Sequence, residues 1–150
     1  MKKKILITAL IILAISLVSA VTLSLRPKNE LVPVEYATAM KGNKPFIMLF
    51  YSDWCSSCMK FSGKYRMLKE IYPTQYDFVM INTDDPKSKN VLNDYMPTGL
   101  PTVYIVDPTI DNRILLNNAI YWDFGKLRAE CDRYLRIHSI IEKGKAQSQN

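Results

Sequence analysis

The feature that most constrains the fold is the apolar run at residues 46–51, which ends just before a pair of closely spaced cysteines. An uninterrupted hydrophobic run of this length is typical of a strand buried on both faces. After the pair, Cys55 and Cys58, the apolar residues adopt helical spacing up to Pro73. The pattern predicts an α/β protein in which the cysteines lie where a strand gives way to a helix.

The remaining segments continue this alternation. Helices are expected at 34–41, 58–71 and 87–95, and strands at 46–51, 76–82, 101–106 and 113–117. A last helix should begin at Asp123, with one face made of Phe124, Leu127, Cys131, Leu135, His138 and Ile141. This order predicts one domain at 34–142, in which helices flank a mixed sheet. The first strands should pair in parallel and the last two antiparallel, and a flexible tail is expected at 143–150.

An apolar run at residues 5–25, preceded by three lysines, predicts a signal peptide or a membrane anchor. At about 1.5 Å per residue, a helix of this length would span a bilayer core of about 30 Å. An anchor is favoured because the run continues past Ala20, where a signal peptidase would cut. In both alternatives residues 26–33 are a tether, and the rest lies outside the cytoplasm by the positive-inside rule.

The charge pattern does not indicate a nucleic-acid-binding surface. Lys2, Lys3 and Lys4 supply half of the formal net charge of +6, and the other basic residues are dispersed along the chain. Such residues are typical of solvated faces and do not form a basic patch.

The cysteine pair favours redox chemistry over a structural role. Outside the cytoplasm two nearby thiols can form a disulfide, but a bridge across so short a loop stabilises a fold little. At a helix N-terminus the unpaired N–H groups and the helix dipole stabilise a thiolate, which favours Cys55 as the nucleophile. Cys58, one turn later, can then resolve a mixed disulfide. Trp54 is expected to shelter the apolar side of the pair.

The sequence FYSDWCSSC at 50–58, followed by GLPT at 99–102, resembles the thioredoxin superfamily. It is most similar to exported members and to the C-terminal thioredoxin domain of transmembrane thiol:disulfide interchange reductases. The resemblance implies a thioredoxin-like fold and a thiol:disulfide oxidoreductase that needs no cofactor. It also implies a cis peptide bond at Pro101 beside Cys55, and main-chain binding of substrate at Leu100. Trp54, Leu100 and Pro101 would form the docking groove.

Two positions depart from the family pattern. Many thioredoxins place a buried acid six residues before the first cysteine and a lysine near it on the next strand. Here these positions hold Leu49 and Met80. Without a nearby base, we expect Cys58 to lose its proton with difficulty. The spacer Ser56-Ser57 indicates an intermediate reduction potential, between about −270 and −120 mV.

Several alternatives remain open at this point. Reduction of disulfides in exported proteins, with electrons from a membrane partner, is the first hypothesis, and oxidation or isomerisation is the second. A third is a non-catalytic module that binds a partner or holds a metal. Zinc would need Cys131 and His138 beside the pair, but their spacing favours packing roles on the last helix. Tyr121 and Trp122 either line the groove or cap the core.

Overall fold

The computed structural model describes residues 34–148, which are built around a four-stranded sheet in the order β2-β1-β3-β4. The strands are β1 (Phe46–Tyr51), β2 (Asp77–Asn82), β3 (Thr102–Asp107) and β4 (Asn112–Leu115). β1 pairs in parallel with β2 and antiparallel with β3, and β3 pairs antiparallel with β4. The predicted mixed sheet is confirmed, and its most apolar strand, β1, lies in the interior.

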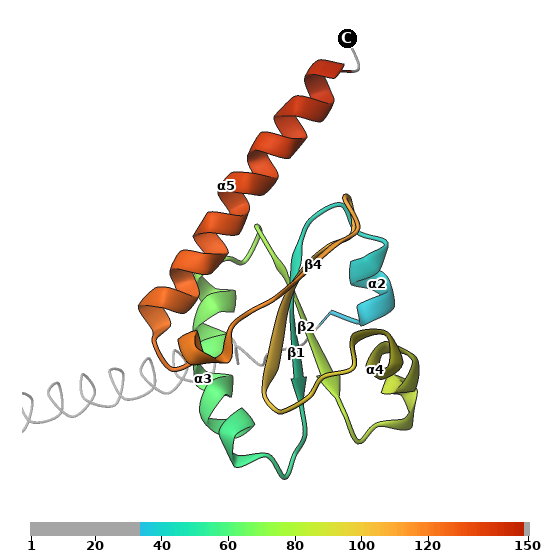
Figure 1. The fold of residues 1–150 in the computed structure, drawn as a ribbon, viewed down its shortest axis with the longest axis vertical. Coiled ribbons are helices and arrows are strands. Elements are labelled where there is room, and N and C mark those ends of the chain that lie inside the picture. Colours follow the sequence, from blue (N-terminus) through green and yellow to red (C-terminus); the bar gives the residue numbers. More distant parts are fainter. Residues whose placement is uncertain (1–33, 149–150) are drawn as a thin grey trace, which may run out of the picture. The chain divides into compact units, whose positions relative to one another are not determined.

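Helices cover both faces of this sheet (Figure 1). On one face lie α2 and α4, and on the other lie α3 and α5. Their bounds are α2 (Tyr36–Met40), α3 (Ser56–Ile71), α4 (Lys89–Tyr95) and α5 (Phe124–Ser148), with short 3₁₀ turns η1 (Pro86–Ser88) and η2 (Asn118–Ile120). The predicted element order is therefore confirmed.

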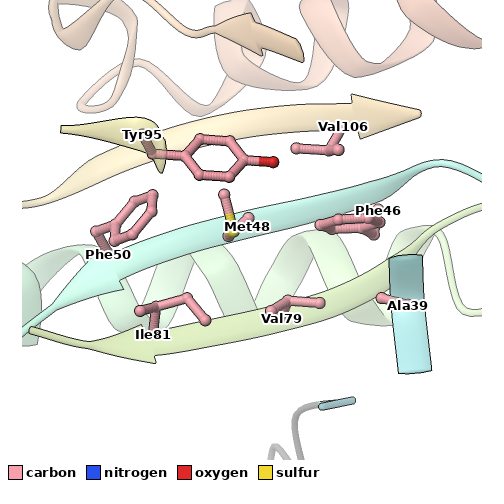
Figure 2. Close-up of a cluster of buried hydrophobic side chains, with 8 residues drawn as sticks. All are labelled: Ala39, Phe46, Met48, Phe50, Val79, Ile81, Tyr95 and Val106. Atoms are coloured by element: carbon pink, nitrogen blue, oxygen red, sulfur yellow. The ribbon is translucent and has the colours of Figure 1, made fainter. Parts of the chain in front are cut away.

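The core on the α2 and α4 side is built from alternate residues of the strands (Figure 2). Because side chains alternate across a strand, every second residue of β1 points to this face. The cluster consists of Ala39, Phe46, Met48, Phe50, Val79, Ile81, Tyr95 and Val106. These side chains are all buried, and the intervening residues of β1 are buried on the opposite face. Burial on both faces explains why the sequence of β1 is continuously apolar.

On the opposite face, tyrosines tie α3 and α5 to the sheet. The Tyr65 hydroxyl lies 2.8 Å from the carbonyl oxygens of Ile47 and Val79, and its ring meets Phe78 edge-on. The Tyr76 hydroxyl donates to the Cys131 carbonyl of α5 at 2.8 Å. Leu127, Cys131 and Tyr134 form the buried stripe of α5, so the predicted face is correct except that it omitted Tyr134.

The direction of β3 differs from the expectation of parallel pairing among the first strands. Between β2 and β3, residues 83–101 form η1, α4 and the loop that ends at the cis Leu100–Pro101 bond. A parallel connection needs only about a dozen residues, so this segment is long enough for either direction, and it returns to the end of the sheet where it began. β3 begins at the edge where β2 ends and runs antiparallel to β1.

The last helix is longer than expected. The sequence predicts a tail at 143–150, but α5 continues to Ser148. Lys145 contributes to this extension, since its ammonium lies 2.9 Å from the Glu142 carboxylate and donates to the Thr109 carbonyl at 3.3 Å. Among the helices at 34–148, none is long and apolar enough to cross a membrane. The predicted signal or anchor at 5–25 and the tether at 26–33 lie outside the described residues.

Candidate active site

The two sequence motifs lie at the same edge of the sheet. Chain geometry places them there: β1 ends at Tyr51 shortly before Cys55, and Phe50 pairs with Thr102, the residue that follows Pro101. The Leu100–Pro101 peptide bond is cis, as the family resemblance implies. Pro101 therefore lies next to the C-terminal end of β1, the end that leads to Cys55.

Cys55 and Cys58 form a disulfide, with Cα atoms 5.2 Å apart. Cys55 is the N-cap of α3: its sulfur accepts the Cys58 N–H at 3.1 Å, and its carbonyl accepts the Met59 N–H at 3.1 Å. The first turn of α3 contains no acidic residue, so no carboxylate there opposes a negative charge on sulfur. This geometry favours the thiolate of Cys55 after reduction.

The two sulfur-bearing residues are nearly buried, at 6% and 4% exposure for Cys55 and Cys58, whereas Trp54 is 73% exposed. The expected sheltering role of Trp54 is therefore limited, because most of its ring faces solvent. An exposed aromatic side chain adjacent to a reactive cysteine offers apolar contact area to a docking protein.

Two hollows are lined in part by the loop that carries Leu100. One is lined by residues of α4 and of this loop, including Met96, Pro97 and Leu100. The other is lined by Leu100 and Pro101 together with Leu115, Leu116, Asn117, Asn118 and Tyr121. Sequence reasoning did not select Asn117 and Asn118, because only the return of β4 to this edge brings them beside the cis proline.

The apolar replacement of the usual acid and lysine is confirmed as a matched pair. Leu49 on β1 and Met80 on β2 are register partners in the parallel ladder, and Leu49 is 1% exposed. Neither side chain can accept a proton from a thiol. Ser52 was not singled out from sequence, yet it is buried next to the cysteine turn and its hydroxyl has no hydrogen-bond partner.

Cys131 and His138 have structural roles on α5. Burial, assisted by Asp132 and Glu130, raises the pKa of the Cys131 thiol to about 12, which keeps that thiol protonated and unreactive. His138 Nδ1 contacts the buried Asp107 carboxylate at 2.6 Å. In the part of the chain that is described, no three His, Cys, Asp or Glu side chains form a metal-binding group.

Tyr121 is buried and caps the core, whereas Trp122 is only partly buried. Tyr121 is 2% exposed and lines one of the hollows; its hydroxyl accepts the Val103 N–H and donates to the Leu116 carbonyl, so it joins β3 to the residue that follows β4. Trp122 is half exposed and meets Phe61 of α3 edge-on. Asp53 lies in the turn that follows β1, and its carboxylate accepts a hydrogen bond from the Asn82 side chain at 3.3 Å.

Comparison with known proteins places these motifs in a family. The profile of the family described as Thioredoxin matches residues 28–113. The thiol:disulfide interchange protein TxlA of Synechococcus elongatus is 38% identical over 66 residues, covering 44% of this chain and 35% of that protein. The TxlA homolog of Synechocystis sp. is 30% identical over 108 residues, covering 67% and 60%. The chain thus spans between about a third and three fifths of the length of these relatives.

Solved structures with the same fold include the thioredoxin of Trypanosoma brucei brucei, with a TM-score of 0.58 at 15% identity. That match covers 75% of this chain and 99% of the other. The J-Trx1 fragment of ERdj5 matches with a TM-score of 0.57 at 16% identity, covering 67% of this chain and 48% of the fragment. At these identities the likeness shows the fold alone.

Proposed function

Because the chain belongs to the thioredoxin family, we propose that it is a thiol:disulfide oxidoreductase whose working dithiol is Cys55 and Cys58. The observation that carries this proposal is the disulfide at the start of α3, in which Cys55 is the N-cap and accepts the Cys58 N–H. A disulfide placed at a helix N-terminus can open to give a stabilised thiolate, whereas a purely structural bridge gains nothing from that position.

In the proposed reduction, the Cys55 thiolate attacks one sulfur of a client disulfide. A Cys55–client disulfide forms, and the other client sulfur leaves with the bonding electron pair. The Cys58 thiolate then attacks the Cys55 sulfur, closes the intramolecular disulfide and releases the second client sulfur as a thiolate. Two electrons pass from the protein to the client, and the protein ends in the disulfide form seen in the structure.

The docking groove is proposed to consist of Trp54, Leu100 and Pro101. Trp54 is the exposed apolar surface next to the nucleophile, and the hollows beside Leu100 and Pro101 give an extended client segment room to approach. Main-chain groups at Leu100 are the proposed hydrogen-bonding sites for that segment. Client proteins with accessible disulfides or thiols fit such a surface.

We further propose that the catalytic domain at residues 34–142 works outside the cytoplasm on exported proteins. The support is the apolar run at 5–25 behind three lysines, together with the similarity to thiol:disulfide interchange proteins. Reduction there requires electrons from a membrane donor. The redox state of the pair in the cell decides the direction: a mostly reduced pair supports reduction, and a mostly oxidised pair supports oxidation or isomerisation.

The test of the activity is reduction of insulin disulfides by the protein and by a Cys55→Ala, Cys58→Ala double variant. We expect complete loss of activity in the double variant with its circular dichroism spectrum retained. Cys131→Ala is the matched control and should keep the activity, because that thiol is buried and protonated. Loss of the fold in the double variant would instead indicate a structural bridge.

A further inference from the structure

Ser52 carries a buried hydroxyl group that the fold does not use. The residue is 1% exposed, and its Oγ has no hydrogen-bond partner within the described chain. Buried polar groups in native proteins are almost always paired, so an unpaired one calls for an explanation such as a role in another state of the protein. The position of Ser52 indicates which state that is.

Ser52, Cys55 and Cys58 belong to one hydrogen-bonded turn. The Ser52 carbonyl accepts the Cys55 N–H at 3.2 Å, and the Cys55 sulfur accepts the Cys58 N–H at 3.1 Å. All three residues are at most 6% exposed. The residue with the unpaired hydroxyl is thus joined by a backbone hydrogen bond to Cys55, and all three residues are shielded from solvent.

We propose that Ser52 is a positioning residue that donates its Oγ hydrogen to the Cys58 sulfur once the disulfide has opened; this inference rests on the proposed function. The Cys55 sulfur already has a donor, the Cys58 N–H, whereas the Cys58 sulfur accepts no hydrogen bond in the described part of the chain. Cys58 is also the sulfur that the usual acid of the family would serve, and the two paired positions that match the family's acid and lysine hold Leu49 and Met80.

A donated hydrogen bond changes the chemistry of Cys58 without moving a proton to serine. The Cys58 thiol gives its proton to water, and the serine hydroxyl keeps its own proton while it stabilises the resulting thiolate. That thiolate then attacks the Cys55 sulfur of the mixed disulfide, as in the proposed reaction. Ser52 thereby offsets part of the desolvation that burial imposes on a charged sulfur.

The test isolates Cys58 by titration in a Cys55→Ala background of the full-length protein. The rate of iodoacetamide alkylation of the Cys58 peptide is followed by mass spectrometry as a function of pH. This readout keeps Cys131 separate. Adding Ser52→Ala should raise the pKa of Cys58 by about one unit, which lowers its thiolate fraction near neutral pH about tenfold. Ser52→Thr retains a hydroxyl and should lie closer to the parent than the alanine variant does.

Ser56→Ala is the matched control, because it removes an exposed hydroxyl from the spacer between the cysteines. An unchanged pKa in Ser52→Ala, or an equal shift in Ser56→Ala, would overturn the proposal. The midpoint of urea unfolding of oxidised Ser52→Ala should match that of the parent, since the hydroxyl makes no bond in that state; a large drop would assign Ser52 to the fold instead. The titration is independent of insulin reduction, so an inactive parent with a shifted Cys58 would refute only the proposed activity.

Discussion

We infer that Cys58 receives little help in losing its proton, because Leu49 and Met80 cannot act as bases. Their side chains are paired across β1 and β2, where many thioredoxins have an acid and a lysine. Leu49 is almost completely buried, so no solvent-exposed base approaches through that position. The release of a client from its mixed disulfide is therefore expected to be slow relative to thioredoxins that retain the acid.

Leu49→Asp should accelerate this step. A carboxylate at this position can act as a general base toward Cys58, and such assistance is typically worth about 10²–10⁴-fold in rate. We expect at least about a tenfold faster resolution, measured by stopped-flow decay of a mixed disulfide between Cys55 and a chromophoric thiol. Leu49→Asn introduces similar polarity without a base and should not accelerate it. Equal rates in Leu49→Asp and the parent would contradict this account of Cys58.

The anchoring of α5 depends on one buried carboxylate at the end of β3. Burial alone would raise the pKa of Asp107, but hydrogen bonds from Thr109, Tyr134 and His138 outweigh it and hold the pKa below its usual value. The Tyr134 hydroxyl donates at 2.9 Å, and Thr109 donates through both its N–H and its hydroxyl. Because the folded-state pKa is lowered, this carboxylate stabilises the fold above about pH 4, and the contribution is lost as the pH falls through that pKa.

Asp107→Asn should lower the free energy of unfolding at pH 7 by about 2 kcal/mol, because charge-assisted hydrogen bonds to a buried group are replaced by weaker ones. The difference from the parent should shrink below pH 4, where the parent carboxyl is being protonated as well. Urea unfolding at several pH values checks this. Asp111→Asn changes an exposed turn carboxylate and should have little effect at any pH. A pH-independent loss in Asp107→Asn would show that shape, not charge, anchors α5.

Within α3, a glycine offers a simple gain in stability. Gly63 lies in the helix interior, and a Cβ added there would meet nothing within 4 Å. Gly63→Ala should raise the free energy of unfolding by about 0.5–1 kcal/mol, since glycine loses more backbone freedom on folding. Gly42→Ala is the contrasting case, because its Cβ would lie 3.1 Å from the Ala39 carbonyl oxygen. Insulin reduction should be unchanged in Gly63→Ala. A lower free energy of unfolding in Gly63→Ala than in the parent would contradict the packing of α3.

Local patterns predicted the elements well and their relative directions less well. The apolar runs of β1 and β2 and the helical periodicity of α3 are strong signals, because each reflects the burial of residues that are close together in the sequence. The antiparallel direction of β3 follows from a connection, residues 83–101, that returns to the end of the sheet where β2 ends, and no local pattern in the sequence indicates that return. Tyr134 was overlooked because tyrosine is amphipathic, and its burial depends on Asp107 27 residues away. Ser52 has no sequence signal at all, since its burial comes from the turn that follows β1.

For the whole molecule, the proposal that the protein works outside the cytoplasm depends on the N-terminal apolar run at residues 5–25. An uncleaved anchor at residues 5–25 should leave the full-length protein in the membrane fraction after alkaline carbonate extraction. N-terminal analysis of the same sample should find the sequence before Ala20 intact. Release into the soluble fraction with a new terminus at Val21 would show instead that the run is a cleaved signal peptide.

The central claim is that Cys55 attacks and Cys58 resolves, and trapping the mixed disulfide tests it most directly. Without Cys58, the Cys55–client bond has no internal thiol to break it. Cys58→Ala incubated with a disulfide-containing client should therefore accumulate a covalent complex whose bond maps to Cys55 by mass spectrometry, and Cys55→Ala should accumulate none. A complex linked through Cys58, or equal trapping by both variants, would contradict the assignment.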